Sequence, residues 1–441
     1  MPDRISALVS ILGGLLMLLL SCASWSASLT EGDKVRSSAE GIEDKVIAWR
    51  RDIHQHPELS NREVRTAALV ARHLESLGFD EVRTQVGHTG VLGILKGGLP
   101  GPTVALRADM DALPVKEMVN LPFASKVRTT YRGQEVDVMH ACGHDAHTAI
   151  LMGAAEVLAG MREQIPGTIR FIFQPAEEGA PEGETGGAKL LIEEGVLAGP
   201  NPPTAIFGLH VAPAPAGTVS AGSGGVMAAA DNFSIKIIGR QTHGGLPWLG
   251  VDPITIASQV VLALQTIPSR QLDVTKSAAV ISVGAINGGV RGNIIPDDVT
   301  MIGTIRTFDK QVQKNLHERM RKVVKGIAEA SGATAEVTIN AVMPVTYNDP
   351  QLARTMAPVL RDLFGSAFVA GGFTMGAEDF AFYQEKIPGL FLSLGVLPVG
   401  ISPEKAAPNH SPFFQVNEAE LVKGVTMLSH LALAYLKQAE H

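Results

Sequence analysis

The sequence has little of several features that would assign it to a simple class of protein. Only two cysteines, Cys22 and Cys142, occur among its 441 residues, too few for a disulfide framework. Positive charge is not in surplus, since 37 lysines and arginines stand against 44 acidic residues and the net charge is −7. We therefore expect no nucleic-acid partner, because phosphate binding requires clustered positive charge. What is present, 45% hydrophobic and 18% charged residues, is typical of a globular protein with a large core.

Long hydrophobic runs are also scarce, and the longest lies at the N-terminus. Residues 5–20 carry no charge and follow Arg4, but this run is shorter than the ~20 residues of a membrane-spanning helix. Small residues follow at once, as in the cleavage region of a signal peptide. We interpret residues 1–27 as a signal peptide cleaved after Ala23 or Ser26, or as a lipoprotein signal ending at residue 21. We expect an exported protein, periplasmic or secreted, without a transmembrane domain after processing; in the lipoprotein alternative it is anchored at Cys22.

Short apolar runs bounded by turn residues predict an α/β fold. They lie at residues 91–95, 103–106, 168–173, 205–209 and 390–395. Runs of this length without alternation are typical of strands covered on both faces, and helical patterns at 42–77 and 148–161 accompany them. We therefore predict a mostly parallel, doubly wound sheet for the catalytic domain.

Between residues 222 and 338 the pattern changes. The expected strands are 232–238, 278–286, 299–307 and 335–339, and the expected helices are 254–266 and 311–331. Their order, β-α-β-β-α-β, is that of the ferredoxin-like α+β fold. We predict an inserted domain at 222–338, which divides the α/β domain into residues 40–221 and 339–441.

Residue types that bind metals are concentrated near the ends of the predicted strands. Cys142 and His144 lie two residues apart in a histidine-rich segment, and thiolate with imidazole suits a borderline-soft divalent metal. The other candidates are Asp109, Asp111, Glu177, Glu178, His210 and His410. Side chains beyond the carboxyl ends of parallel strands converge on one crevice in such a sheet. The sequence therefore predicts one shared site.

Together these segments resemble the metal-dependent amidohydrolases of the M20 peptidase clan. The similarity is to the branch of aminoacylases, hippurate hydrolases and indole-acetyl-amino-acid hydrolases, and it runs from about residue 46 to residue 436. Its landmarks are the segments 56–59, 107–114, 140–147, 174–179, 208–210, 293–296, 376–380 and 409–412.

The resemblance implies a dinuclear metal site. Its five ligands would be Cys142, His144, Glu178, His210 and His410. Glu177 would be the catalytic base and Asp111 would support the site, with Asp109 as its neighbour. Two divalent ions are expected, with manganese or zinc ahead of cobalt or nickel. A metal lowers the pKa of water toward ~7, and a nearby carboxylate can take its proton.

The resemblance also gives the inserted domain a role as a lid and a dimerisation surface. His243 would reach an active site, within the chain or across a homodimer, to stabilise the oxyanion of the tetrahedral intermediate. Asn293 and Arg306 would bind the free carboxylate of the substrate, because an arginine fork matches a carboxylate. The flank of His243 departs from the family pattern: Gly244 and Gly245 replace an alanine pair, and Trp248 stands where relatives have a second histidine.

The function that this resemblance implies is hydrolysis of N-acyl amino acids into an amino acid and a carboxylic acid. The substrate would be a small N-acyl amino acid or a short peptide. Two alternatives stay open: an exopeptidase or N-deacetylase with the same mechanism, and an exported binding protein without turnover. His54 and His56 are interpreted as capping or supporting groups at a helix end.

Overall fold

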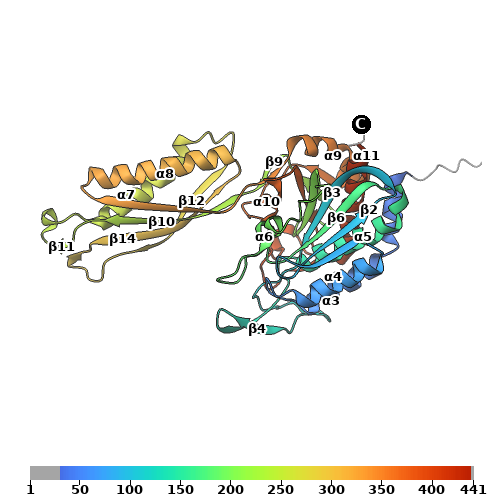
Figure 1. Cartoon of the computed structure of the whole chain (residues 1–441). Helices are drawn as coiled ribbons and strands as arrows, with labels where there is room; N and C mark the ends of the chain where they lie inside the picture. Colours follow the sequence, from blue (N-terminus) through green and yellow to red (C-terminus); the bar gives the residue numbers. More distant parts are fainter. Residues whose placement is uncertain (1–29, 439–441) are drawn as a thin grey trace, which may run out of the picture.

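The computed structural model describes residues 30–438 and consists of two bodies joined by a narrow connection (Figure 1). The larger body, the catalytic domain, contains a central sheet covered by helices. The smaller body, the lid domain, has a sheet of its own. The predicted signal peptide, residues 1–27 with Cys22, lies outside the described residues.

The catalytic domain is built on an eight-stranded sheet. In spatial order its strands are β1 (Glu81–Val86), β2 (Gly90–Lys96), β6 (Pro166–Gln174), β3 (Leu99–Asp109), β7 (Ala205–Ala212), β18 (Gly389–Gly395), β8 (Val219–Ala221) and β17 (Phe368–Ala370). The four central strands, from β6 to β18, are parallel. On one side β2 runs antiparallel to both β6 and β1, and on the other side β8 pairs antiparallel with β18. The prediction of a mostly parallel α/β sheet is therefore confirmed.

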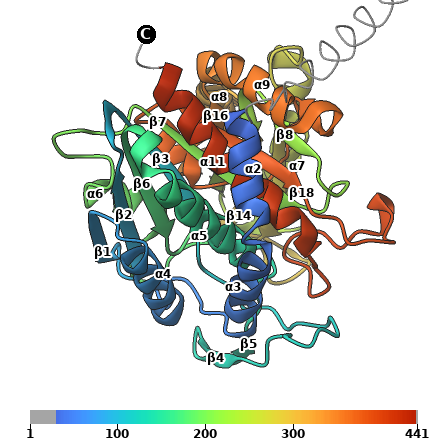
Figure 2. The ribbon, with the colours of Figure 1, turned by 90° about the vertical axis from the view of Figure 1, so that its right-hand side faces the viewer.

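Helices cover both faces of this sheet, because successive side chains of a buried strand point to opposite sides. On one face, which Figure 2 views, Leu106 packs into a core with the helices α2 (Glu31–Glu40), α3 (Glu43–Gln55), α4 (Val64–Ser76), α5 (His144–Gly160), α9 (Pro350–Phe364) and α11 (Leu421–Gln438). On the other face, Ala105 packs into a second core with α6 (Gly187–Glu193) and α10 (Phe380–Gln384). A small hairpin, β4 (Arg128–Tyr131) and β5 (Gln134–Asp137), lies outside both cores.

The lid domain has the order β-α-β-β-α-β. Its elements are β10 (Ala229–Ile238), α7 (Pro253–Thr266), β12 (Ala279–Asn287), β14 (Asp298–Thr307), α8 (Lys310–Ala330) and β15 (Thr334–Met343). The sheet order β12-β14-β10-β15, with every pair antiparallel, is that of a ferredoxin-like fold. Alternating residues of the strands face the two helices and form a separate hydrophobic core. At the far end of the domain β11 (Thr242–His243) pairs with β13 (Ile294–Ile295).

Few contacts hold the lid to the catalytic domain. The connecting segments pair as β9 (Gly224–Met227) and β16 (Thr346–Asn348). Beside them the Phe308 and Phe373 rings meet edge to face at 5.0 Å, and Lys310 Nζ lies 2.7 Å from Glu385 Oε1. Within residues 30–438, no helix has the length and apolar character needed to cross a membrane.

Candidate metal centre

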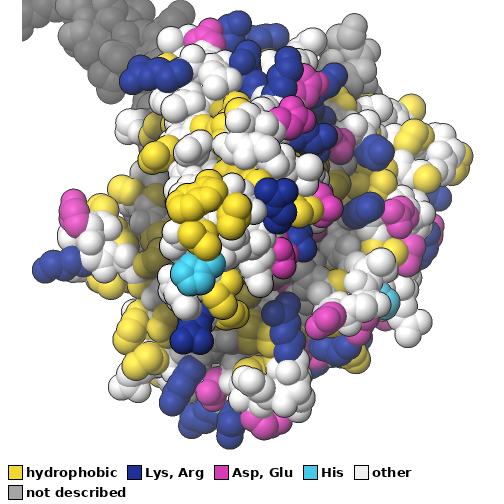
Figure 3. Space-filling model, turned by 90° about the vertical axis from the view of Figure 1, so that its left-hand side faces the viewer, with side chains coloured by type: hydrophobic (Ala, Val, Ile, Leu, Met, Phe, Trp, Pro, Cys, Tyr) yellow, Lys and Arg dark blue, Asp and Glu magenta, His cyan; other side chains and the backbone are white. Residues whose placement is uncertain are grey.

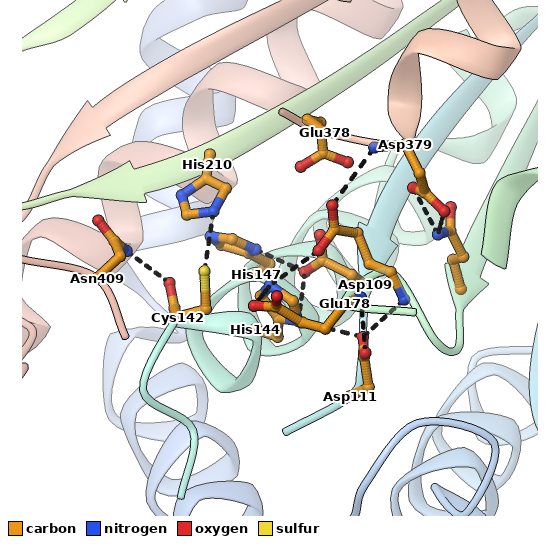
Figure 4. A network of polar contacts seen from close by, with 12 residues as sticks. Asp109, Asp111, Cys142, His144, His147, Glu178, His210, Glu378, Asp379 and Asn409 are labelled. Carbon is orange, nitrogen blue, oxygen red and sulfur yellow. Dashed lines mark hydrogen bonds and ion pairs between the residues drawn. The ribbon is translucent and has the colours of Figure 1, made fainter. Parts of the chain in front are cut away.

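The candidate site lies at the carboxyl ends of the parallel strands, where the sequence places it. Strand β3 ends at Asp109, β6 ends three residues before Glu177, and His210 belongs to β7. Helix α5 begins at His144, directly after the turn that holds Cys142. Figure 4 shows Asp109, Cys142, His144 and His210 gathered in one place at this edge of the sheet.

The turn before α5 depends on Gly143. This residue has a φ of 99°, a left-handed conformation that glycine adopts readily. A Cβ atom at this position would lie 2.3 Å from Val211 Cγ2, so a larger residue would push β7 away. The tight turn presents Cys142 and His144 to the same side of the sheet edge.

A first group of ligand atoms comes from Cys142, His144 and His210, which lie within 4.8 Å of one another. His210 Nε2 is 3.4 Å from Cys142 Sγ, while His210 Nδ1 lies 2.7 Å from the Val211 carbonyl oxygen and donates to it. Burial lowers the pKa of His210 to about 3, so its imidazole is neutral. The Nε2 lone pair is then free to bind a cation.

A second group consists of Cys142, Glu178 and His410. His410 Nε2 lies 3.0 Å from Glu178 Oε1, and the histidine has a left-handed φ of 69°. Two hydrogen bonds fix its loop: the His410 amide donates to the Ala141 carbonyl at 2.7 Å, and the Asn409 amide group donates to the Cys142 carbonyl at 2.8 Å. The His410 side chain is 55% exposed, so the site opens to solvent on this side.

These donors fit divalent metal ions. His144 Nδ1 lies 3.2 Å from Asp111 Oδ1, but the buried His144 Nε2 has no hydrogen-bond partner among the described residues. A buried polar atom normally has a partner, and an imidazole nitrogen beside a thiol and a carboxylate suits a borderline-soft cation. Burial raises the pKa of the Cys142 thiol to about 12, so its thiolate form requires a cation beside the sulfur.

Glu177 occupies a different position from its neighbour Glu178. Its Oε2 lies 3.9 Å from His144 Nε2, and its Oε1 accepts a hydrogen bond from the Asp379 amide at 3.4 Å. Burial and the nearby Glu378 carboxylate raise the pKa of Glu177 well above its ordinary value. The side chain can therefore hold a proton next to the candidate ligands.

The two aspartates at and just after the end of β3, Asp109 and Asp111, hold the surrounding elements. Asp111 accepts hydrogen bonds from the amides of Glu177 and Glu178 at 3.1 and 3.0 Å. Asp109 Oδ1 lies 2.6 Å from His147 Nδ1, and His147 Nε2 accepts a hydrogen bond from the Val211 amide at 2.9 Å. Asp111 thus fixes the glutamate loop, while Asp109 acts through His147 on the strand that carries His210.

The structure also brings in buried groups to which the sequence assigned no role. The Arg107 guanidinium lies between three carboxylates. Its Nη1 is 2.6 Å from Asp109 Oδ2, and its Nη2 is 3.0 Å from Glu378 Oε1 and 2.8 Å from Asp379 Oδ1. These four residues belong to motifs that carry the family resemblance, but a motif does not say which of its polar residues point inward. His54 is expected to be a capping or supporting group. Its Nδ1 lies 2.8 Å from Oδ2 of Asp145, the residue after His144.

Of the three predicted substrate-binding residues of the lid, His243 and Asn293 lie at its far end, whereas Arg306 pairs with Ala230 near the connection to the catalytic domain. His243 and Asn293 are exposed neighbours on the β11–β13 segment, where the Gly244 amide donates to the Asn293 carbonyl at 2.8 Å. That segment is at the end of the lid farthest from the catalytic domain (Figure 1). Arg306 is half-buried on β14, and its guanidinium donates to the Ile305 carbonyl at 3.0 Å. Among the described residues, His243 belongs to none of the groups of ligand atoms around Cys142.

The same end of the lid carries exposed apolar side chains. They are Leu246, Trp248, Leu249 and Val290, and Trp248 is 73% exposed. Figure 3 looks onto this end and shows hydrophobic side chains gathered beside a histidine. Trp248, which departs from the family pattern, is therefore a surface residue in the single chain.

Comparison with known proteins agrees with the geometry. The profile of peptidase family M20/M25/M40 matches residues 105–434. The chain is 41% identical over 407 residues to thermostable carboxypeptidase 2 of Saccharolobus solfataricus, covering 91% of this chain and 98% of that protein. It is 40% identical over 394 residues to the N-acetylcysteine deacetylase of Bacillus subtilis, covering 89% and 97%. Among solved structures, the Bacillus subtilis YXEP protein, a dinuclear metal-binding peptidase of the M20 family, has a TM-score of 0.76 and 38% identity, with 90% of this chain and 99% of that chain covered.

Proposed function

Because the chain belongs to peptidase family M20/M25/M40, we propose that it hydrolyses the amide bond of N-acyl amino acids and releases an amino acid and a carboxylic acid. The observation that carries the proposal is the divergence of two adjacent glutamates. Glu178 lies against His410, whereas Glu177 lies beside Glu378 and Asp379 and remains near His144. One carboxylate is thus placed to bind a cation and the other to move a proton.

We assign Cys142, His144, Glu178, His210 and His410 as the ligands of two divalent ions, with zinc or manganese as the first candidates. When bound, such ions lower the pKa of water toward ~7 and polarise the carbonyl of the scissile amide. Asp111 keeps Glu177 and Glu178 in place through their backbone amides. The Nδ1 contacts of His144 and His210 leave the Nε2 atom of each ring for the cation.

Glu177 is the general base and then the general acid. In the first step its carboxylate takes a proton from the attacking water and holds it at a carboxylate oxygen. In the second step it passes that proton to the nitrogen of the leaving amine, so that no charged amide anion has to leave.

The lid is proposed to recognise the amino-acid part of the substrate. Arg306 and Asn293 would bind its free carboxylate, and His243 would stabilise the developing oxyanion. Because the single chain leaves His243 and Asn293 at the far end of the lid, they must be supplied by closure of the lid or by a second copy. A homodimer formed through the lid domain would provide them in trans.

The discriminating experiment is an assay of the purified protein with its metals measured. N-acetyl and N-benzoyl amino acids, their amidated analogues and unblocked dipeptides would be tested with and without a chelator, and metals would be counted by mass spectrometry. We expect about two metals per chain and chelator-sensitive release of amino acids from the N-acyl substrates. Preference for dipeptides would instead favour an exopeptidase, the activity named for the Saccharolobus relative. Metal without turnover on any amide would favour the binding protein.

Export is proposed on the basis of residues 1–27. N-terminal sequencing and intact mass of protein isolated from whole cells would separate the processing routes. A lipid-modified Cys22 at the N-terminus would show a lipoprotein, Ser24 or Ala27 would show ordinary cleavage, and an intact Met1 would contradict export.

A further inference from the structure

A buried carboxylate outside the metal motifs contacts the loop that carries the two glutamates. Glu63 is fully buried, and its Oε1 accepts a hydrogen bond from the Ala176 amide at 3.0 Å. The same oxygen accepts from the Asn61 amide at 3.1 Å, and Oε2 accepts from the Thr89 hydroxyl. The Ala176 amide immediately precedes the two amides that Asp111 binds. Three successive amides of one loop are therefore held by two buried carboxylates.

The loop needs external support because of its backbone conformation. Ala176 has a φ of 55°, a left-handed conformation that an L-residue with a Cβ atom adopts at a cost. Such a conformation persists only where surrounding contacts over-determine it. This reversal at Ala176 sets the directions in which the next two side chains leave the backbone.

The Glu63 side chain binds the loop that carries the two glutamates and does not cap the helix that follows it, α4. Glu63 is the residue before α4, a position from which an acidic side chain often caps the helix, yet it makes no capping hydrogen bond. Glu58 does that instead, since it accepts hydrogen bonds from the amides of Arg65 and Thr66 at 2.8 Å each. The Glu63 carboxylate is thus free for the glutamate loop.

We propose that Glu63 is a positioning residue for the hydrolysis: with Asp111 it clamps the amides of residues 176–178 and so fixes the divergence of Glu177 and Glu178. The inference rests on the proposed amide hydrolysis. Burial and the neighbouring Asp111 carboxylate raise the pKa of Glu63 to about 8, so a neutral side chain can fulfil this role. Glutamine has the required shape, because its carbonyl can accept from both amides and its NH2 group can donate to Thr89.

The test compares Glu63→Ala with Glu63→Gln and uses Glu58→Ala as the matched control. We expect Glu63→Ala to lower kcat by about 10- to 100-fold, with a much smaller change in KM, because the reacting groups are displaced while the lid is untouched. Glu63→Gln should retain most of the kcat. Glu58→Ala removes an acid that also binds two amides, and it should lower the Tm without lowering the kcat of the folded enzyme. If Glu63→Ala fails to fold, Glu63→Asp replaces it, since the shorter side chain cannot reach both amides.

A second substitution tests the backbone argument directly. Glycine adopts the left-handed region without the penalty of a Cβ atom, so Ala176→Gly in the Glu63→Ala background should restore part of the lost kcat. Equal kcat in Glu63→Ala and Glu58→Ala, or a Glu63→Gln enzyme as impaired as Glu63→Ala, would overturn the clamp.

Hydrogen exchange separates this inference from the proposed function. In the metal-free protein, exchange in a peptide covering residues 175–179 should become faster in Glu63→Ala and stay unchanged in Glu58→Ala. A wild-type protein that hydrolyses no amide but shows this pattern would retain the clamp and refute the hydrolysis. Unchanged exchange in Glu63→Ala would refute the clamp whatever the activity.

Discussion

The residues around Cys142 are mostly buried and fixed by hydrogen bonds, whereas the candidate substrate-binding residues at the far end of the lid are exposed. The candidate ligands of the catalytic domain lie on segments far apart in the sequence, and hydrogen bonds between segments fix them, as the Asp111 carboxylate fixes the His144 ring at 3.2 Å. On the lid, His243 is exposed, and within residues 30–438 its ring accepts a hydrogen bond only from the nearby Gly245 amide, at 2.9 Å. The first set is in place once the domain has folded, whereas the second depends on something that covers it.

This difference divides the chemistry between the two regions. Preorganised groups lower the barrier of the chemical step, because they need no rearrangement at the moment of reaction. Groups on the lid that must first be brought to the site would contribute mainly to the binding of the substrate. We therefore expect changes near Cys142 to reduce kcat or metal content, and changes at the proposed carboxylate-binding residues of the lid to act mainly on KM.

The largest effect should come from Glu177→Gln. The amide cannot take the proton of the attacking water, so kcat should fall by about 10²- to 10⁴-fold. Metal content should stay near two per chain, because the candidate ligands, including Glu178, are unchanged. Kinetics and metal analysis of the same preparation measure both. A parallel loss of metal and activity would make Glu177 a ligand or a folding residue.

Cys142→Ala should follow, because Cys142 belongs to both groups of ligand atoms. Removal of the sulfur takes a donor from each group, and we expect metal affinity to fall by at least about tenfold. Titration with zinc and manganese, followed by metal counting after gel filtration, measures the loss. Unchanged stoichiometry and affinity would return Cys142 to the role of a small buried core residue.

The contrast also explains which parts could be predicted from the sequence. The strands that end at Asp109 and Gln174 each contain a short, mostly apolar run, so both the fold and the expected place of the site follow from local pattern. The roles of Glu63 and Arg107 do not, because hydrogen bonds between segments distant in sequence give no periodic signal. The position of the lid relative to the site was equally hidden, since it depends on a connection of few contacts.

Arg306→Ala tests the lid side of the comparison. If the guanidinium binds the substrate carboxylate, its loss should raise KM by about tenfold for N-acyl amino acids with a free carboxylate and leave kcat nearly unchanged. The amidated analogues lack that anion, so they serve as the control and should be insensitive to the substitution. An equal rise for both kinds of substrate would show that Arg306 supports the lid strand and does not bind the carboxylate.

Trp248→Ala should have the smallest effect on stability. It tests whether the exposed end of the lid is free in solution or buried against a second chain. Trp248 is 73% exposed in the single chain, and a substitution at such a surface position changes stability by about 0.5 kcal/mol or less. Trp49 is the matched control: it is partly buried against the main core of the catalytic domain, and its ring lies 4.6 Å from that of His73, so Trp49→Ala should lower the Tm by several degrees. Thermal melts and sedimentation of both variants measure the contrast. A Tm loss for Trp248→Ala as large as that for Trp49→Ala, or a change from dimer to monomer, would show that the exposed end of the lid is buried against a second chain in solution.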